Sequence, residues 1–249
     1  MKKLIYLTVV ILLFSCNGTN VPDCFQNSGA IVQKEVVVPD FSSIVVFERV
    51  QLIIKQAAEQ KVIIETGEYL MDDIAVSVDN GQLILKDDNG CNLVRDYGIT
   101  KIYVSAPNIT QIRSSTGLTT LGQGVLNYPN LSLISEDFGQ EGNYHTVGDF
   151  KMEVNCQNLN VLNNNQSHMF LSGTVDHLTI GFYAGNSRFE GRHLIAQNIN
   201  FFQRSSNDMI LNARTSIKGE IRSTGNVVLV NEPPVVDVQT FYTGRLIIE

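Results

Sequence analysis

The chain has 249 residues, with 18 lysine and arginine residues against 25 aspartate and glutamate residues, so its formal net charge is −7 at pH 7. Nucleic-acid binding needs a basic face that displaces counterions from phosphates, and we therefore expect no nucleic-acid partner. Hydrophobic residues make up 43% of the chain, which excludes wholesale disorder.

Residues 1–15 have the pattern of a secretion signal peptide. Lys2 and Lys3 give it a positive start, and an apolar stretch of about eleven residues follows. That stretch is too short to span a bilayer, which takes about 20 residues. Leu13-Phe14-Ser15-Cys16 resembles the lipobox of bacterial lipoproteins, and this resemblance implies cleavage before Cys16 and lipidation of that cysteine. The alternative is an ordinary secretory signal that is cut at about the same place.

Residues 16–30 are predicted to form a lipidated polar tether, and the membrane is the expected partner of this anchor. Beyond the membrane the compartment is oxidising, which permits disulfides. Cys24 and Cys91 both lie in polar, turn-like segments, and we expect them to pair. Cys156 lies in an alternating stretch and is expected to be a small buried residue. Because no cysteine or histidine pair has the spacing of a zinc site, no metal is expected.

Short runs rich in β-branched residues fill the region from residue 31 to residue 105. The strongest local signal is Asp79-Asn80-Gly81, which predicts a type I′ hairpin turn between two strands, because asparagine and glycine tolerate positive φ. Glu68–Asp73 is the one helix-like patch and is long enough for about one turn.

From about residue 100 a corner of small residues recurs at intervals that average about 21 residues, as a β-solenoid requires. Glycine and asparagine are expected to supply left-handed backbone at these corners, and Asn163-Asn164-Asn165 to stack side-chain amides between coils. An antiparallel β-sandwich would explain the alternation of apolar and polar residues equally well, but not the recurring corner. The predicted corners are Gly117, Gly139, Asn164, Gly185, Ser206, Gly225 and Gly244.

We therefore predict an all-β chain with one β-solenoid domain over residues 31–249. Residues 31–105 would be its hairpin-rich N-terminal part, and residues 106–249 would form regular coils. The alternation inside each coil places Leu178, Ile180 and Phe182 toward the core.

Three pairs of aromatic residues, Phe182-Tyr183, Phe201-Phe202 and Phe241-Tyr242, each lie shortly before a predicted corner. Because neighbours on a strand face opposite sides, one ring of each pair should point outward. From the inward pattern these rings are Tyr183, Phe202 and Phe241. Outward rings on one face would make an apolar binding platform for sugar rings or for a protein partner. The alternative is that a neighbouring loop or the terminal strand covers them.

The segment from Phe41 to the C-terminus resembles the putative auto-transporter adhesin, head GIN domain family (DUF2807). The resemblance rests on Val78–Leu83, on the Ser-x-Gly corners, and on Gly219–Val227 followed by Pro233-Pro234. Asp23–Gln26 together with Asn89–Tyr97 resembles a lipoprotein branch of the family. The resemblance implies a right-handed parallel β-helix-like fold, and it supplies no catalytic residues.

Groups suited to catalysis are scattered along the sequence. His145, His168, His177 and His193 lack the spacing of metal ligands and are expected at the surface. Asp87-Asp88-Asn89-Gly90 offers oxygen ligands for Ca²⁺ without the full EF-hand pattern, and is expected to be a solvated turn. A glycan-cleaving enzyme would need clustered carboxylates. The best pool for that purpose is Asp149, Glu153 and Asp176 with Arg188 and Arg192.

Nothing in the spacing of that pool singles out a site, so no catalytic residue, metal or cofactor is expected. We predict a non-catalytic lipoprotein of the bacterial envelope, anchored at the outer membrane, that presents a rigid surface for adhesion. Its ligand would be a glycan or an envelope or host protein. One alternative is a carbohydrate-binding or carbohydrate-active protein on the same scaffold. Another is a subunit that pairs through the open solenoid end, since Arg245–Ile248 is a short edge strand flanked by charge.

Overall fold

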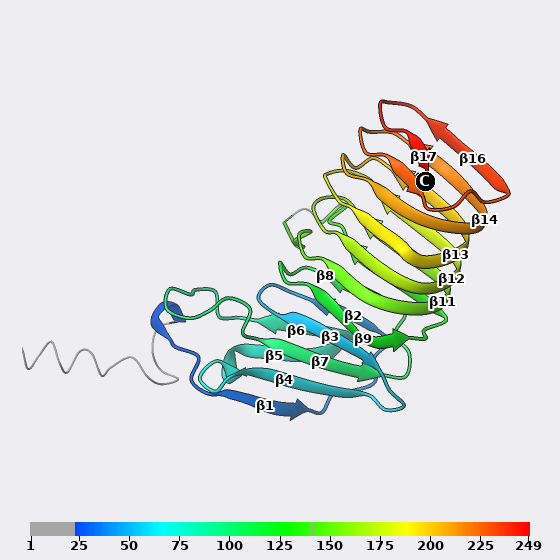
Figure 1. The fold of residues 1–249 in the computed structure, drawn as a ribbon. Coiled ribbons are helices and arrows are strands. Elements are labelled where there is room, and N and C mark those ends of the chain that lie inside the picture. Colours follow the sequence, from blue (N-terminus) through cyan, green and yellow to red (C-terminus); the bar gives the residue numbers. More distant parts are fainter. Residues whose placement is uncertain (1–22, 141) are drawn as a thin grey trace, which may run out of the picture.

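A computed structural model describes residues 23–140 and 142–249 (Figure 1). The expected signal peptide, Cys16 and the first part of the tether lie outside the described residues. The described chain is a solenoid of β-strands, which confirms the predicted fold class. Its helices are the short η1 (Asp23–Phe25) and η2 (Met71–Asp73), and the second lies within the predicted helix-like patch. No helix among these residues is both long enough and apolar enough to cross a membrane.

The N-terminal end of the solenoid mixes parallel and antiparallel pairing (Figure 1). Its strands are β1 (Ile31–Val36), β2 (Ser43–Val46), β3 (Gln51–Gln56), β4 (Lys61–Gly67), β5 (Ile74–Asp79), β6 (Gln82–Asp87) and β7 (Lys101–Ala106). β2 and β3 form a coil that pairs in parallel with β6 and β7. On the outer side of β6 and β7, β5 and β4 pair antiparallel, and β1 pairs antiparallel with β4. Antiparallel strands therefore close this end of the parallel stack.

The hairpin between β5 and β6 has the predicted turn. Asn80 and Gly81 have φ values of 49° and 76°, as a type I′ turn requires. The two strands pair antiparallel from Asp79 and Gln82 outward. The prediction from Asp79-Asn80-Gly81 is thus confirmed.

The rest of the chain stacks coils onto the other side of β2 and β3 (Figure 1). The strands are β8 (Gln111–Ser114), β9 (Thr120–Leu126), β10 (Asn130–Ser135), β11 (Phe150–Asn163), β12 (Met169–Phe182), β13 (Phe189–Gln203), β14 (Met209–Ile221), β15 (Val227–Leu229), β16 (Val235–Thr240) and β17 (Leu246–Ile248). Each coil has two legs. The first leg passes through β9, the start of β11 to β14, β15 and β17, and the second leg passes through β8, β10, the end of β11 to β14, and β16.

The pairing register gives the length of one coil. Phe150 pairs with Met169, Met169 with Phe189, and Phe189 with Met209, so that one coil takes about 20 residues. This length agrees with the interval expected from the corners. All four side chains are fully buried or nearly so, and they form one column of alternating rings and thioethers through the core.

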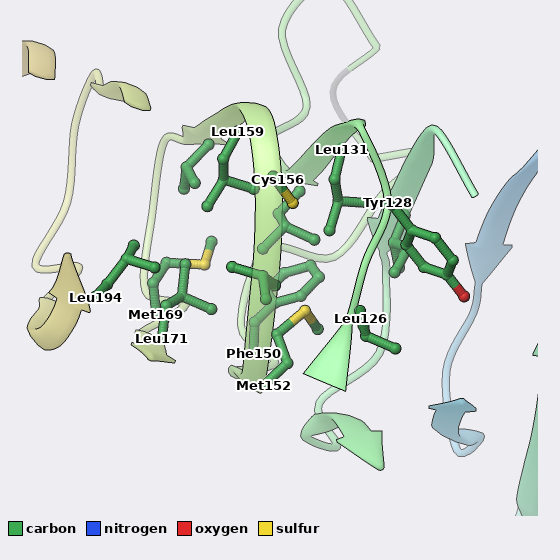
Figure 2. Packing of buried hydrophobic residues seen from close by; sticks show 14 of the residues in the cluster. Leu126, Tyr128, Leu131, Phe150, Met152, Cys156, Leu159, Met169, Leu171 and Leu194 are labelled. Carbon is green, nitrogen blue, oxygen red and sulfur yellow. The ribbon is translucent and has the colours of Figure 1, made fainter. Parts of the chain in front are cut away.

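The core is continuous along the stack, and Figure 2 shows part of its packing. Leucine side chains from several coils surround Met152, Met169 and the thiol of Cys156. Cys156 is a free, buried cysteine, and burial raises the pKa of its thiol to about 11. The thiol therefore stays protonated and serves as a small apolar side chain.

The backbone conformation at the corners differs from the prediction. Among the predicted corner residues only Gly139 and Gly185 have positive φ, so the general expectation of left-handed corners was wrong. The corners need small residues mainly because successive coils approach closely. A Cβ on Gly225 would lie 2.1 Å from the carbonyl oxygen of Asn207, and one on Gly244 would lie 2.3 Å from that of Gly225. Gly139 lies in a longer connection between β10 and β11.

The side-chain amide of Asn163 does not stack on the next coil, in contrast to the prediction for residues 163–165. Asn163 donates a hydrogen bond to the carbonyl oxygen of Ser167 at 2.5 Å and so closes its own corner. Amide pairs between coils occur at the opposite bend, where Asn155 donates to Asn127 at 2.9 Å and Asn158 donates to Asn130 at 2.7 Å. The two legs of each coil meet at this bend, which brings equivalent side chains of successive coils together.

A disulfide joins Cys24 to Cys91 and fixes the N-terminal segment beside the turn after β6. The expected solvated turn is only partly exposed, since Asp88 and Gly90 face solvent whereas Asp87 and Asn89 are buried. Asn89 donates hydrogen bonds to Gln26 at 2.8 Å and to Asp73 at 3.0 Å. Burial raises the pKa of the Asp87 carboxyl, although the backbone N–H of Asn89 and the Arg49 side chain oppose this effect. The segment before β1 contacts the buried side of this turn through the disulfide and the Gln26–Asn89 hydrogen bond.

Candidate functional site

Four aromatic rings and one guanidinium group form a row along one side of the solenoid. We call this row, made of Phe138, Tyr183, Phe202, Arg222 and Phe241, the aromatic stripe. The ring centroids of Phe138 and Tyr183 lie 5.4 Å apart in an edge-to-face arrangement. Those of Tyr183 and Phe202 also lie 5.4 Å apart and are stacked. The guanidinium carbon of Arg222 lies 5.9 Å from the Phe202 centroid and 4.0 Å from the Phe241 centroid.

The register of the second legs explains why these residues meet. Phe182, Gln203, Ile221 and Thr240 occupy equivalent positions on β12, β13, β14 and β16. The chain therefore leaves each strand at the same height of the coil. The residues that follow are Tyr183, Arg204, Arg222 and Phe241, so that side chains distant in sequence stand one above another.

A glycine on β12 leaves the space that allows the Tyr183 ring to contact the Phe202 ring. Gly181 on β12 pairs with Phe202 on β13, and its missing side chain leaves a space on the outer face of the sheet. The Tyr183 ring lies in that space, since a Cβ on Gly181 would be 2.6 Å from it. The ring thus folds back over its own strand and stacks with the ring on the next coil. Offset stacking of this kind contributes about 0.5–1.5 kcal/mol beyond the buried area.

The stripe is partly open to solvent. Phe138 and Phe241 are 56% and 51% exposed, whereas Tyr183 and Phe202 are half-buried by their neighbours. Arg222 donates from Nε to Glu220 at 2.5 Å, which holds its guanidinium group between the Phe202 and Phe241 rings. A cation above an aromatic ring is stabilised by about 0.5–1 kcal/mol at an exposed site. The arrangement offers flat apolar faces beside a fixed positive charge.

The structure therefore brings two of the expected outward rings, Tyr183 and Phe202, into direct contact, and links Phe241 to them through Arg222. Sequence reasoning missed Phe138 and Arg222. Arg222 carried a usable signal, because it precedes a corner at the same coil position as Tyr183 and Phe241. Phe138 lies in the longer connection before Gly139, where no repeat indicates its position.

The pool of groups considered for glycan cleavage is dispersed. Glu153 and Arg192 line an open groove of about 320 Å³ on the outer face of the first legs, together with Phe170 and His193. Asp176 lines a different groove at the bend between the legs.

Three members of that pool have structural partners. Asp149 accepts a hydrogen bond from the backbone N–H of His168 at 2.8 Å. Arg188 pairs with Glu190 at 2.8 Å, and Arg192 makes a bidentate pair with Glu249. In the part of the chain that the structure describes, no three histidine, cysteine or acidic side chains are grouped as metal ligands.

The fold and the stripe define a class of protein, the parallel β-solenoids whose successive coils present their side chains as one continuous surface. The chain belongs to the family described as putative auto-transporter adhesin, head GIN domain, whose profile matches residues 40–233. That description supports a role in adhesion or binding at the cell surface or envelope. It does not describe an enzyme.

Solved structures share the fold. A putative adhesin from Bacteroides fragilis NCTC 9343 is 18% identical, with a TM-score of 0.78 over 90% of this chain and 99% of its own. A putative lipid binding protein from Parabacteroides distasonis ATCC 8503 is 14% identical, with a TM-score of 0.64 over 89% and 97%. A putative adhesin from Parabacteroides merdae ATCC 43184 is 14% identical, with a TM-score of 0.63 over 94% and 98%. No curated protein matches this chain.

Proposed function

We propose that this chain is a non-catalytic adhesive lipoprotein of the bacterial envelope, held to the membrane through Cys16, whose aromatic stripe is the surface that binds a glycan. The observation that carries the proposal is the continuous contact from Phe138 through Tyr183 and Phe202 to Arg222 and Phe241. Sugar rings present flat C–H faces that suit such a surface, and the family description supports an adhesive role.

The scaffold supports this role because it holds the rings in fixed positions. Three residues of the stripe, Tyr183, Arg222 and Phe241, directly follow β12, β14 and β16. Because each of these strands pairs in register with a neighbouring coil, the backbones of the three residues cannot move independently. A surface that is already ordered loses little conformational entropy when it binds a ligand.

Removing the Tyr183 ring is expected to weaken glycan binding about tenfold, since one stacking contact of about 1.4 kcal/mol corresponds to that factor. The purified chain would be applied to a glycan array, and Tyr183→Ala and Gly181→Val would be compared with it. Gly181→Val keeps both rings but fills the space in which the Tyr183 ring lies. The melting temperature of each variant should stay within about 3 °C of the parent.

Phe170→Ala is the matched control, because Phe170 is also an exposed ring but lies on the first leg. Equal loss of binding in Phe170→Ala would show that the stripe is not the contact surface. Failure of the parent chain to bind any glycan would remove the glycan as ligand.

The anchor has its own test. When the full chain is expressed with a labelled fatty acid, the parent should carry the label and sediment with membranes. Cys16→Ala should lose the label and leave the membrane fraction, because it lacks the thiol to which the lipid is attached. Cys156→Ala removes a buried thiol and should keep the label. An unlabelled parent chain would contradict lipidation at Cys16.

A further inference from the structure

The two ends of the solenoid are finished in opposite ways. At the N-terminal end, antiparallel strands cover the last parallel coil, and the outermost of them, β1, exposes Gln33, Lys34 and Glu35. Charged residues, lysine above all, on an edge strand prevent other chains from pairing with it. At the C-terminal end, β16 pairs with β14 and β17 pairs with β15. No other described strand pairs with β16 or β17, so each leaves one backbone edge free.

Among the described residues, no further coil covers the C-terminal end of the solenoid (Figure 1). Ile217 is fully buried, whereas Val236, which pairs with it on the next coil, is 40% exposed. Leu229 is fully buried, whereas its partner Ile248 is 43% exposed. These side chains point along the same core columns, and they differ in exposure because no further coil covers the last one.

β16 lacks the features that protect an edge strand. Over Val235–Thr240 it has no lysine, arginine or proline, and its one charged residue, Asp237, is paired with Lys218 of the preceding coil at 3.3 Å. A free, flat edge with an apolar inner face is a template for another strand.

We propose that the C-terminal end docks a second copy of this chain, with β16 pairing antiparallel to its own counterpart around a twofold axis at Val238. In this register Val238 faces itself on the inner side, and Val236 faces Thr240. On the outer side Asp237 lies opposite Gln239 of the second copy, so no like charges meet. The two open cores then cover each other, and the free N–H and C=O groups of β16 gain partners.

We choose a second copy of the chain, paired through the two C-terminal ends, because the charges on β1 oppose head-to-tail stacking and a twofold pairing closes after two chains. Stacking of one C-terminal end on the next N-terminal end would build fibres, and the charged edge of β1 opposes it. A twofold pairing of two C-terminal ends uses only the unprotected edge and closes after two chains. The β16 sequence is compatible with itself in that register, which an edge built for an unlike partner does not need.

Cysteine cross-linking tests the register. The full chain is purified in detergent, with Val238→Cys and Val235→Cys as separate variants, and each is oxidised and run on a non-reducing gel. Val238→Cys places two thiols across the axis at cross-strand distance, about 4.5–5.5 Å between Cβ atoms. Val235→Cys places them at opposite ends of the paired strands, about 20 Å apart at about 3.4 Å per residue. We expect a several-fold higher yield of disulfide-linked dimer for Val238→Cys.

Sedimentation velocity gives an independent measurement. The parent chain should shift from monomer to dimer as concentration rises, and Val238→Lys should remain monomeric while keeping the parent's circular dichroism spectrum. Equal cross-linking of the two cysteine variants, or a parent chain that is monomeric at every concentration, overturns the proposal. Capture of an unlike protein by a monomeric parent would also overturn it. None of these three results tests glycan binding by the stripe.

Discussion

Phe189→Ala is expected to lower the free energy of unfolding by about 3 to 5 kcal/mol, the usual cost of deleting a buried phenylalanine side chain. Phe189 is fully buried and stands between Met169 and Met209 in the core column. Its ring centroid lies 6.3 Å from that of Phe182. The coils above and below are fixed by backbone hydrogen bonds, so they cannot close around the cavity that the substitution leaves.

A urea titration followed by circular dichroism measures this loss. Phe170→Ala is the control, because Phe170 pairs with Glu190, the residue next to Phe189, but points outward and is 38% exposed. Its removal should cost below about 1 kcal/mol. Comparable losses in the two variants would mean that the two sides of the sheet do not differ in burial as the structure shows.

Gly185→Ala should destabilise the chain by about 3 kcal/mol, through backbone strain and a steric clash together. Gly185 has a φ of 84°, which side chains other than glycine rarely adopt. A Cβ there would also lie 1.9 Å from the carbonyl oxygen of Asn165 on the preceding coil. That oxygen accepts hydrogen bonds from the backbone N–H of Asn186 and the hydroxyl of Ser187, both at 2.9 Å, so the corner cannot move away.

Gly139→Ala separates the two causes. Gly139 has a φ of 67°, but no described atom lies within 4 Å of the position of its Cβ. This substitution carries the strain alone and should cost about 1 kcal/mol. The difference between the two variants, measured by urea titration, is the cost of the close approach between coils. Equal losses would show that strain alone decides both.

The direction of each side chain within a strand followed from the sequence. Leu178, Ile180 and Phe182 are buried as expected, because a strand alternates its faces every residue and only one face meets the core. The coil length followed as well, since one corner must recur in each coil. The Asp79-Asn80-Gly81 turn followed from local backbone preferences alone.

The order of the first coils did not follow from the sequence. β2 and β3 lie between β6 with β7 on one side and β8 with β9 on the other, so neighbours in the stack are distant in the chain. β-Branched runs identify strands but do not specify their partners. The prediction of left-handed backbone at the corners was also wrong. At Gly225 and Gly244 glycine is required because two coils approach closely, not because of the turn type.

For the candidate site, the sequence by itself determined that Tyr183, Phe202 and Phe241 face outward, because alternation and the corner spacing are local properties. Only the tertiary structure decided that Tyr183 lies over Gly181 against Phe202, that Arg222 stands between two rings, and that Phe138 joins the row. Such contacts depend on the register between coils and on the path of a connection. Both are set by packing among residues about 20 or more positions apart, which no local pattern records.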